Sequence, residues 1–156
     1  MTTREGDPMT RTTSDPPIER AFSLTLLRMV LGSILFIEGT GKLWGWFDGA
    51  GLEATRLFYD RLHVPLSPHH ALIVGSIEGL GGILLFTGLL TRLAVFAIAL
   101  TFVGALWIIA VRSGSVHNGH LIGFATSLVI LQFGSGPWSL DGLFGRTAQT
   151  AHKGNT

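Results

Sequence analysis

Four long apolar blocks, joined by polar connections, constrain this chain more than any other feature. The blocks run over residues 21–44, 70–90, 92–111 and 119–133. A helix needs about 20 apolar residues to cross a hydrocarbon core of about 30 Å, and the first three blocks meet that length. The third and fourth blocks lack the polar face that a helix of a soluble bundle would carry. The pattern therefore predicts an all-α integral membrane protein, folded as a bundle of four transmembrane helices.

The composition supports a membrane protein and excludes several function classes. Charged residues make up 13% of the chain, against about 25% in an ordinary soluble domain. The net charge of +1 leaves no basic stripe for phosphates, so we expect no nucleic-acid partner. The chain has no cysteine, which excludes thiolate catalysis, iron–sulfur ligation and attachment of a prosthetic group through cysteine. We therefore expect no covalent cofactor.

The flanks of the apolar blocks differ from them in composition. Residues 1–20 are rich in Thr, Pro, Asp and Arg, and predict a disordered N-terminal arm. Residues 21–145 form the predicted membrane domain, and residues 146–156 a flexible C-terminal tail. The first apolar block is too long for a standard signal peptide and has no clear cleavage site.

The connections between the blocks predict how the helices are arranged. Only Thr91 and Arg92 join the second span to the third, and residues 112–118 join the third to the fourth, so both pairs are antiparallel neighbours. The long connection, 45–69, contains a helical segment at 52–62. One face of that segment combines apolar and weakly polar side chains, namely Leu52, Thr55, Phe58, Tyr59 and Leu62. We expect a short amphipathic helix at the membrane interface between spans one and two.

Basic residues outside the spans predict the orientation. One side of the membrane would carry Arg4, Arg11, Arg20, Arg92, Arg146 and Lys153, and the other Arg56, Arg61 and Arg112. The excess of positive charge marks the cytoplasmic side, so both termini are predicted to be cytoplasmic.

Ionisable residues within the first two spans are the candidates for function. Arg28, Glu38 and Lys42 fall within an arc of about 80° on span one, and Glu78 lies in span two. Each such group costs roughly 2.5–3.5 kcal/mol at the centre of a bilayer. Their arc must therefore face the bundle interior. Glu38 and Lys42 are also spaced for an ion pair along the helix.

The glycines around Glu78 predict where the second span meets another helix. Gly75, Gly79 and Gly82 share the arc that holds Glu78, so a neighbouring helix can approach closely there. Glu38 and Glu78 lie at similar depth, about 12–15 Å from the outer end of their spans. Together with Lys42 they predict a polar pocket between the first two spans, in the outer half of the bundle, and His120 enters the fourth span from the same side.

Two interpretations of this cluster remain open. A carboxylate in a buried pocket could carry a proton, or the group could hydrogen-bond a polar headgroup such as that of a quinone. Alternatively, the charges form an internal ion-pair network that only sets helix register. Arg28, about 15 Å from Glu38 along the helix, is expected to extend its side chain to the cytoplasmic interface.

Two other site types are not supported. His117 and His120 are too small a set to specify a metal, and His63, His69 and His70 all lie in the outer connection, so neither a metal nor a haem is predicted. The segment Glu38-Gly-Thr-Gly-Lys42 fails as a phosphate loop, because Phe36 and Leu43 stand at required glycine and hydroxyl positions.

Two motifs resemble the signatures of the DoxX-like membrane proteins. The first begins Gly39-Thr-Gly-Lys42-Leu-Trp-Gly45, the second begins Glu78-Gly-Leu-Gly81-Gly82, and Ser139-Leu-Asp141 is similar to the tail motif. The resemblance covers about residues 22 to 145. The positions carried over are Gly39, Lys42, Gly45, Glu78, Gly81, Gly82, Gly88, Thr91 and Arg92. The sequence departs from the family at Glu38, where histidine is frequent, and at Gly119-His120-Leu, where an acidic residue or tyrosine is frequent.

The resemblance implies a multi-pass protein of the bacterial inner membrane with a role in redox chemistry. It points to a membrane subunit of a quinone-linked redox or oxidative-stress system, with a bound quinone and soluble or membrane redox partner proteins. Such a protein would be an oxidoreductase subunit and not a self-sufficient enzyme. The residues themselves leave two alternatives: a non-enzymatic anchor or assembly protein, and a small proton-coupled transporter, which with four helices would need to form a homo-oligomer.

Overall fold

The computed structural model describes residues 18–65, 67–113, 118–134 and 139–141, and over these residues the chain is helical with no strand. Its elements are α1 (Ile18–Trp44), α2 (Gly51–Arg61), α3 (Ser67–Thr87), α4 (Thr91–Ser113) and α5 (Asn118–Phe133). The predicted tail at 146–156 lies outside the described residues, as does the predicted arm except for residues 18–20, which open α1.

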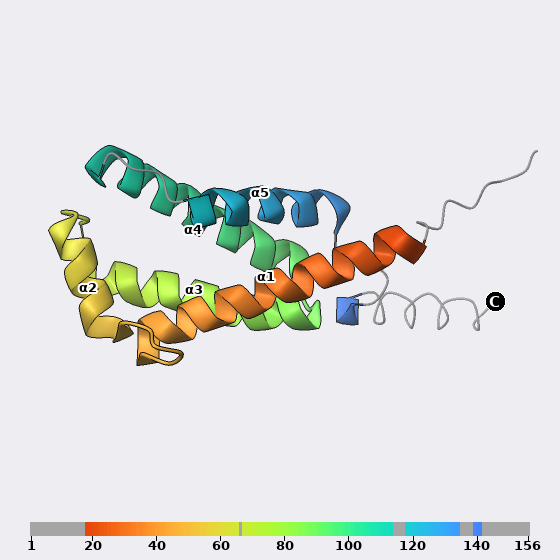
Figure 1. Cartoon of the computed structure of the whole chain (residues 1–156), viewed down its shortest axis with the longest axis horizontal. Coiled ribbons are helices and arrows are strands. Elements are labelled where there is room, and N and C mark those ends of the chain that lie inside the picture. The colour runs from red at the N-terminus through yellow and green to blue at the C-terminus, as the bar shows by residue number, and fades with distance from the viewer. Residues whose placement is uncertain (1–17, 66, 114–117, 135–138, 142–156) are drawn as a thin grey trace, which may run out of the picture.

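The long helices form two pairs (Figure 1). α1 lies along α3, and α4 lies along α5. Contacts between α3 and α4 join the two pairs. α2 crosses the end of the molecule where α1 ends and α3 begins. The opposite end, called the turn end below, holds the start of α1, the α3–α4 turn and residues 139–141. The three long helices alternate in direction, as the short connections predict.

The predicted helices are confirmed with small shifts at their ends. α1 starts at Ile18 instead of residue 21, and α3 covers Ser67–Thr87 instead of 70–90. α3 ends early because Gly88 adopts φ 72°, a left-handed conformation that ends a helix. The amide N–H of Gly88 and that of Leu89 both donate to the carbonyl oxygen of Leu84, which completes the cap.

Three of the described helices are long and apolar enough to cross a membrane: residues Ala21–Trp44, His69–Thr87 and Thr91–Arg112. The fourth predicted span, α5, is an apolar helix of 16 residues, about 24 Å long at 1.5 Å per residue. Because that is shorter than a hydrocarbon core of about 30 Å, the count of four spans stays a prediction. So does the cytoplasmic placement of both termini.

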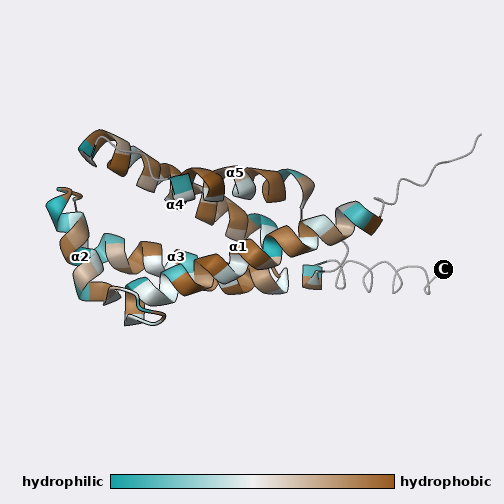
Figure 2. Ribbon diagram, viewed as in Figure 1, coloured by the Kyte–Doolittle hydropathy of each residue, from teal (hydrophilic) through white to brown (hydrophobic). Residues whose placement is uncertain are grey.

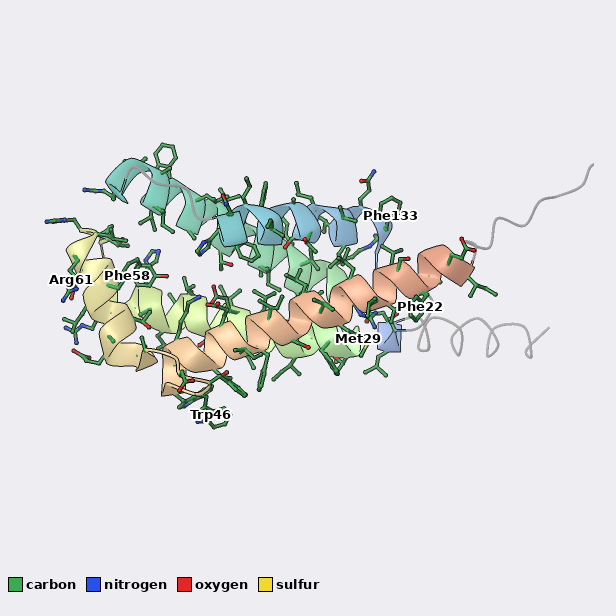
Figure 3. All side chains as sticks on the ribbon, in the orientation of Figure 1. Phe22, Met29, Trp46, Phe58, Arg61 and Phe133 are labelled. Carbon is green, nitrogen blue, oxygen red and sulfur yellow. The ribbon has the colours of Figure 1, made fainter. Side chains whose placement is uncertain are left out.

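Hydrophobic residues predominate along the long helices (Figure 2), and many of the large ones are exposed. Hydrophobic side chains such as Phe22, Met29 and Phe133 project from the helices and are exposed (Figure 3). The core between the helices contains a continuous cluster of buried side chains, namely Leu31, Leu35, Leu85, Val95, Ile98, Phe102 and Ile130. The polar cluster predicted from the sequence lies beyond this core, toward the end that α2 covers.

Glycines let α1 and α3 touch through their backbones. A Cβ atom on Gly39 would overlap the backbone of Gly79 and would lie 2.7 Å from the carbonyl oxygen of Gly75. Further along the crossing, a Cβ on Gly32 would lie 2.8 Å from the carbonyl oxygen of Gly82. The predicted close approach at Gly75, Gly79 and Gly82 is confirmed, and the approaching helix is α1.

Residues 139–141 bind the α3–α4 turn at the turn end. The Asp141 carboxylate accepts hydrogen bonds from the backbone N–H groups of Leu90 (2.9 Å) and Thr91 (3.0 Å), and so caps α4. The amide of Asp141 donates in turn to the carbonyl oxygen of Gly88. A capping carboxylate that is distant in sequence therefore holds the end of the described chain against the bundle.

Arg28 belongs to this same end. Its guanidinium group lies against Gly88, where a Cβ would clash with it, and its charge acts on Asp141. The side chain is only 3% exposed. Arg28 therefore reaches the end of the bundle toward which it was expected to extend, but it is buried there instead of open to water, because Gly88 leaves room for the guanidinium group beside the turn.

The glycine crossing predicts a large effect from one added methyl group. Gly39→Ala should lower the free energy of unfolding by about 1–3 kcal/mol, because backbone atoms cannot move aside as a flexible side chain would. Gly104→Ala in α4 is the control, since nothing lies within 4 Å of a Cβ built there. Thermal unfolding in lipid nanodiscs measures both. Equal effects of the two substitutions would contradict the backbone contact.

The Asp141 cap predicts a stability that depends on acid. Burial raises the pKa of Asp141, but the two backbone N–H bonds and the Arg28 charge outweigh it, so the pKa lies below the ordinary 3.8. A lowered carboxyl pKa contributes stability above the unfolded pKa and loses it as the pH falls through the folded pKa. Asp141→Ala should cost about 0.5–2 kcal/mol near neutral pH and nothing in strong acid. Asp141→Asn, which keeps an acceptor oxygen but cannot titrate, should remove the part of the acid dependence that Asp141 contributes, as measured by thermal unfolding.

Candidate functional site

A cleft of about 910 Å³ opens at the end of the bundle that α2 covers. Helices α1, α2, α3 and α4 line its walls, with the loop after α1 and the first turn of α5 completing them. All four residues singled out from the sequence, Glu38, Lys42, Glu78 and His120, line this one cleft. Its volume is in the range of small-molecule sites, about 300–1,000 Å³. The lining is mainly apolar, so the few polar groups dominate its chemistry.

Lys42 and Glu78 form the central ion pair of the cleft. The Lys42 Nζ atom lies 2.5 Å from Glu78 Oε2 and 3.5 Å from Glu38 Oε2. The Glu78 side chain is only 7% exposed, whereas that of Glu38 is 59% exposed. The amine therefore belongs mainly to the buried carboxylate of α3, and Glu38 adds a second, outer negative charge.

The glycine crossing sets this geometry. Gly39 contacts Gly79 through the backbone, and Glu78 immediately precedes Gly79. Lys42 follows Gly39 by three residues, close to one helical turn, so it lies on the same side of α1. The short distance between the helix axes then brings a lysine of α1 within reach of a glutamate of α3.

Helix α2 contributes Tyr59 to the same cleft. Burial raises the pKa of the Tyr59 phenol, the nearby Lys42 charge lowers it, Glu78 raises it, and the net direction is upward. The phenol therefore stays protonated at physiological pH and offers a hydrogen-bond donor. Its ring lies edge-on to His70, with ring centroids 6.0 Å apart.

Thr55 holds α2 in place. This residue is buried, and its hydroxyl donates to the carbonyl oxygen of Gly51 at 2.8 Å and lies 3.5 Å from that of Lys42. Of the five residues predicted as one face of an interfacial helix, Thr55, Phe58, Tyr59 and Leu62 line the cleft, whereas Leu52 does not and is 37% exposed. That face therefore turns inward to the bundle, although Phe58 stays half exposed.

The far wall of the cleft comes from α4 and α5. Thr101 and Gly104 of α4 line it, and the half-buried His120 ring packs edge-on against Phe102 at 6.2 Å between centroids. The interpretation that the site lies between the first two spans alone is therefore incomplete. The sequence did not single out α4, because nearly all of its residues in the cleft wall are uncharged and apolar and resemble those that face lipid.

Sequence reasoning placed Tyr59 on a helix face but not in the site. It is the only tyrosine of the chain, and its position on the inward face of α2 was the available signal. Whether that face turned toward lipid or toward Lys42 depended on the fold of the 45–69 connection, which spacing alone does not determine.

The remaining motif residues serve packing, capping or the turn. A Cβ on Gly75 would meet the Leu43 side chain at 2.8 Å, and one on Gly81 would meet Ile98 of α4 at 2.9 Å. Gly45 adopts φ 72° and ends α1. At the turn end, Thr91 is buried at the start of α4, and Arg92 beside it is exposed.

Within the described residues, no group of three or more His, Cys, Asp or Glu side chains could hold a metal ion. Arg28 was predicted to share an arc of span one with Glu38 and Lys42, but it does not line the cleft. The arrangement of the cleft suits an uncharged, flat ligand with polar edges: apolar walls bury its body, the Lys42 amine and the Tyr59 hydroxyl donate hydrogen bonds, and the carboxylates accept them.

Comparison with known proteins identifies the family. Residues 23–111, more than half of the chain, match the DoxX family. The chain belongs to the DoxX family. The match includes Lys42, Tyr59 and Glu78, and it ends before α5 and residues 139–141, so the resemblance beyond residue 111 stays an expectation.

One relative of this DoxX protein carries a functional name. The protein named "Putative oxidoreductase CatD" of Bacillus subtilis (strain 168) is 32% identical over 93 residues, which is 60% of this chain and 63% of the relative. The DoxX chain thus spans less than two thirds of that relative's length. No solved structure matches the chain.

The buried pair of this DoxX protein predicts unequal effects of its two carboxylates. Glu78→Ala should lower the free energy of unfolding by about 3–5 kcal/mol, because it leaves the Lys42 charge without its buried partner. Glu38→Ala, the matched control at an exposed carboxylate, should cost less than about 1 kcal/mol.

A double substitution separates the ion pair from the fold. Lys42→Met combined with Glu78→Leu should recover much of the stability lost in Glu78→Ala, because an apolar pair of similar volume has no charges to desolvate. Thermal unfolding in nanodiscs provides the measurement. If Glu38→Ala proved as damaging as Glu78→Ala, the assignment of Lys42 to Glu78 would be wrong.

Proposed function

We propose that this DoxX protein is a membrane subunit of a quinone-linked redox or oxidative-stress system, and that its cleft binds the quinone headgroup. The observation that carries the proposal is the Lys42–Glu78 pair, set in a mainly apolar cleft beside Tyr59 and His120. The relative named as an oxidoreductase supports the redox class.

The groups in the cleft fit a quinone headgroup. A quinone ring has two apolar faces and two carbonyl oxygens at opposite edges, so it needs apolar walls and hydrogen-bond donors. Ile77, Ala97 and Ile108 are among the apolar wall residues. The Lys42 amine and the Tyr59 hydroxyl are the donors from α1 and α2, while Glu78 accepts from Lys42 and holds the amine in position.

The same groups can manage protons. Reduction of a quinone consumes two electrons and two protons, so its site needs groups that exchange protons near the carbonyl oxygens. Glu38 is exposed and lies 3.5 Å from the Lys42 amine, and the buried Glu78 lies 2.5 Å from the same amine. The series of contacts from Glu38 through Lys42 to Glu78 therefore leads from an exposed carboxylate to a buried one. A proton can pass along such a series of ionisable groups.

Electrons would come from a partner protein, so the chain acts as a subunit that holds the quinone within the membrane. Quinones are dissolved in the hydrocarbon of respiratory membranes, which assigns the protein to the inner (plasma) membrane of its cell. The α2 helix would then lie at the interface, with Leu57 and Phe58 exposed toward lipid.

Binding of a tailless benzoquinone to the purified protein in nanodiscs tests the proposal. Lys42→Met and Tyr59→Phe should each weaken binding by roughly tenfold, the equivalent of one lost hydrogen bond to a ligand. Glu53→Gln is the control: Glu53 is an exposed carboxylate of α2 that is absent from the cleft lining. The proposal fails if the wild-type protein binds no quinone, or if Lys42→Met binds as tightly as wild type. Retained assembly with a partner without any quinone binding would favour an anchor instead.

A further inference from the structure

A second, smaller cavity lies along the α1–α3 crossing. It is a groove of about 380 Å³ with almost no polar surface, lined by residues of both helices. They include Gly32, Ser33 and Phe36 of α1 and Gly82, Ile83 and Phe86 of α3. The groove lies beside the point where Gly32 and Gly82 bring the backbones of the two helices into contact.

The groove adjoins the polar cleft. Ile37 and Phe47 line both cavities, so these two side chains form their common border. Ile37 directly precedes Glu38, and it lies little more than one helical turn from Lys42. A ligand whose polar head lies at the Lys42–Glu78 pair can therefore extend an apolar chain past Ile37 and Phe47.

The loop that carries Phe47 is held in an unusual backbone conformation. Phe47 has φ 55° and Asp48 has φ 61°, in the left-handed region that bulky residues rarely adopt. The loop is held by Gly49, where a Cβ would overlap the backbone of Gly41, and by the edge-on contact of Phe36 with Phe47 at 6.5 Å. Such strain persists only where the surroundings impose it, and it is concentrated at functional positions.

We propose that this groove is the tail subsite of the cleft, and that it holds the first part of the apolar side chain of a prenylated quinone. The inference rests on the proposed function, since it assigns the tail of the same ligand. From Gly32 to Ile37 the groove follows α1 for about 7.5 Å, so the remainder of a long tail lies in the bilayer.

The groove positions the ligand and does not provide its affinity. Lipid and groove are both apolar, so moving a tail between them releases little free energy. The groove instead gives the tail its route from the cleft to the bilayer, so a side chain that blocks this route displaces the ring of a tailed quinone from the donors at Lys42 and Tyr59. Blocking the groove should consequently harm a tailed quinone and spare a tailless one.

Binding of two quinones to wild-type and variant protein in nanodiscs tests this subsite. One quinone carries a prenyl tail, the other has the same ring without a tail, and concentrations are expressed per lipid. Ile83→Trp fills the groove from α3, and Ser33→Phe fills it from α1. Each should weaken binding of the tailed quinone by roughly tenfold and leave the tailless one unchanged. Leu80→Trp is the matched control, because Leu80 is 64% exposed on α3 and lines neither cavity.

The outcomes separate the subsite from the proposed function. Suppose that both quinones bind wild type and both bind Lys42→Met more weakly, while the groove variants distinguish the tailed from the tailless quinone no better than Leu80→Trp does. The quinone site then stands, and the tail subsite is wrong. If the groove variants weaken the two quinones equally, the groove is structural only. If neither quinone binds wild type, both proposals fail. Native mass spectrometry that finds a phospholipid lost on Ile83→Trp, with tailed-quinone binding intact, would assign the groove to a lipid acyl chain.

Discussion

The backbone contact between α1 and α3 underlies both cavities of this protein. Gly39 lies against Gly79, and Gly32 lies against Gly82, at distances that no side chain could occupy. Because the two helices approach so closely, Lys42 reaches Glu78 across the crossing, and the apolar groove lies beside the contact of Gly32 with Gly82. Helices in lipid associate by close packing through small residues, because lipid tails are as apolar as the helices and the hydrophobic effect therefore does not drive them together.

The two ends of the bundle use their buried charge differently. At the turn end, the Asp141 carboxylate accepts hydrogen bonds from two backbone N–H groups at the start of α4 and lies within reach of the Arg28 charge. At the cleft end, the carboxylates of Glu38 and Glu78 share one amine beside a cavity of about 910 Å³. A charge beside a cavity can meet a ligand, whereas a charge consumed in a cap cannot. This difference separates the candidate site from the structural cluster.

Most of the helical architecture could be predicted from the sequence, and so could the meeting of Lys42 with Glu78. Apolar block length predicts helices, and the glycines around Glu78 predict a close neighbour at similar depth. The environment of Arg28 could not be predicted, because Asp141 and Gly88 reach it from segments that are far away in the chain. The inward turn of Tyr59 and the wall supplied by α4 were also beyond reach, since an apolar helix looks the same whether it faces lipid or a cleft.

The sequence by itself determined which residues must avoid lipid and which helix faces can touch. A buried charge is costly in hydrocarbon wherever the chain folds, and a glycine-lined face is recognisable from spacing alone. Only the tertiary structure decided what those faces enclose. The distance from Lys42 to each carboxylate, the strained loop that places Phe47 between two cavities and the closure of the cleft by α2 all depend on relative positions of separate helices, which hydrophobic periodicity along one helix does not encode.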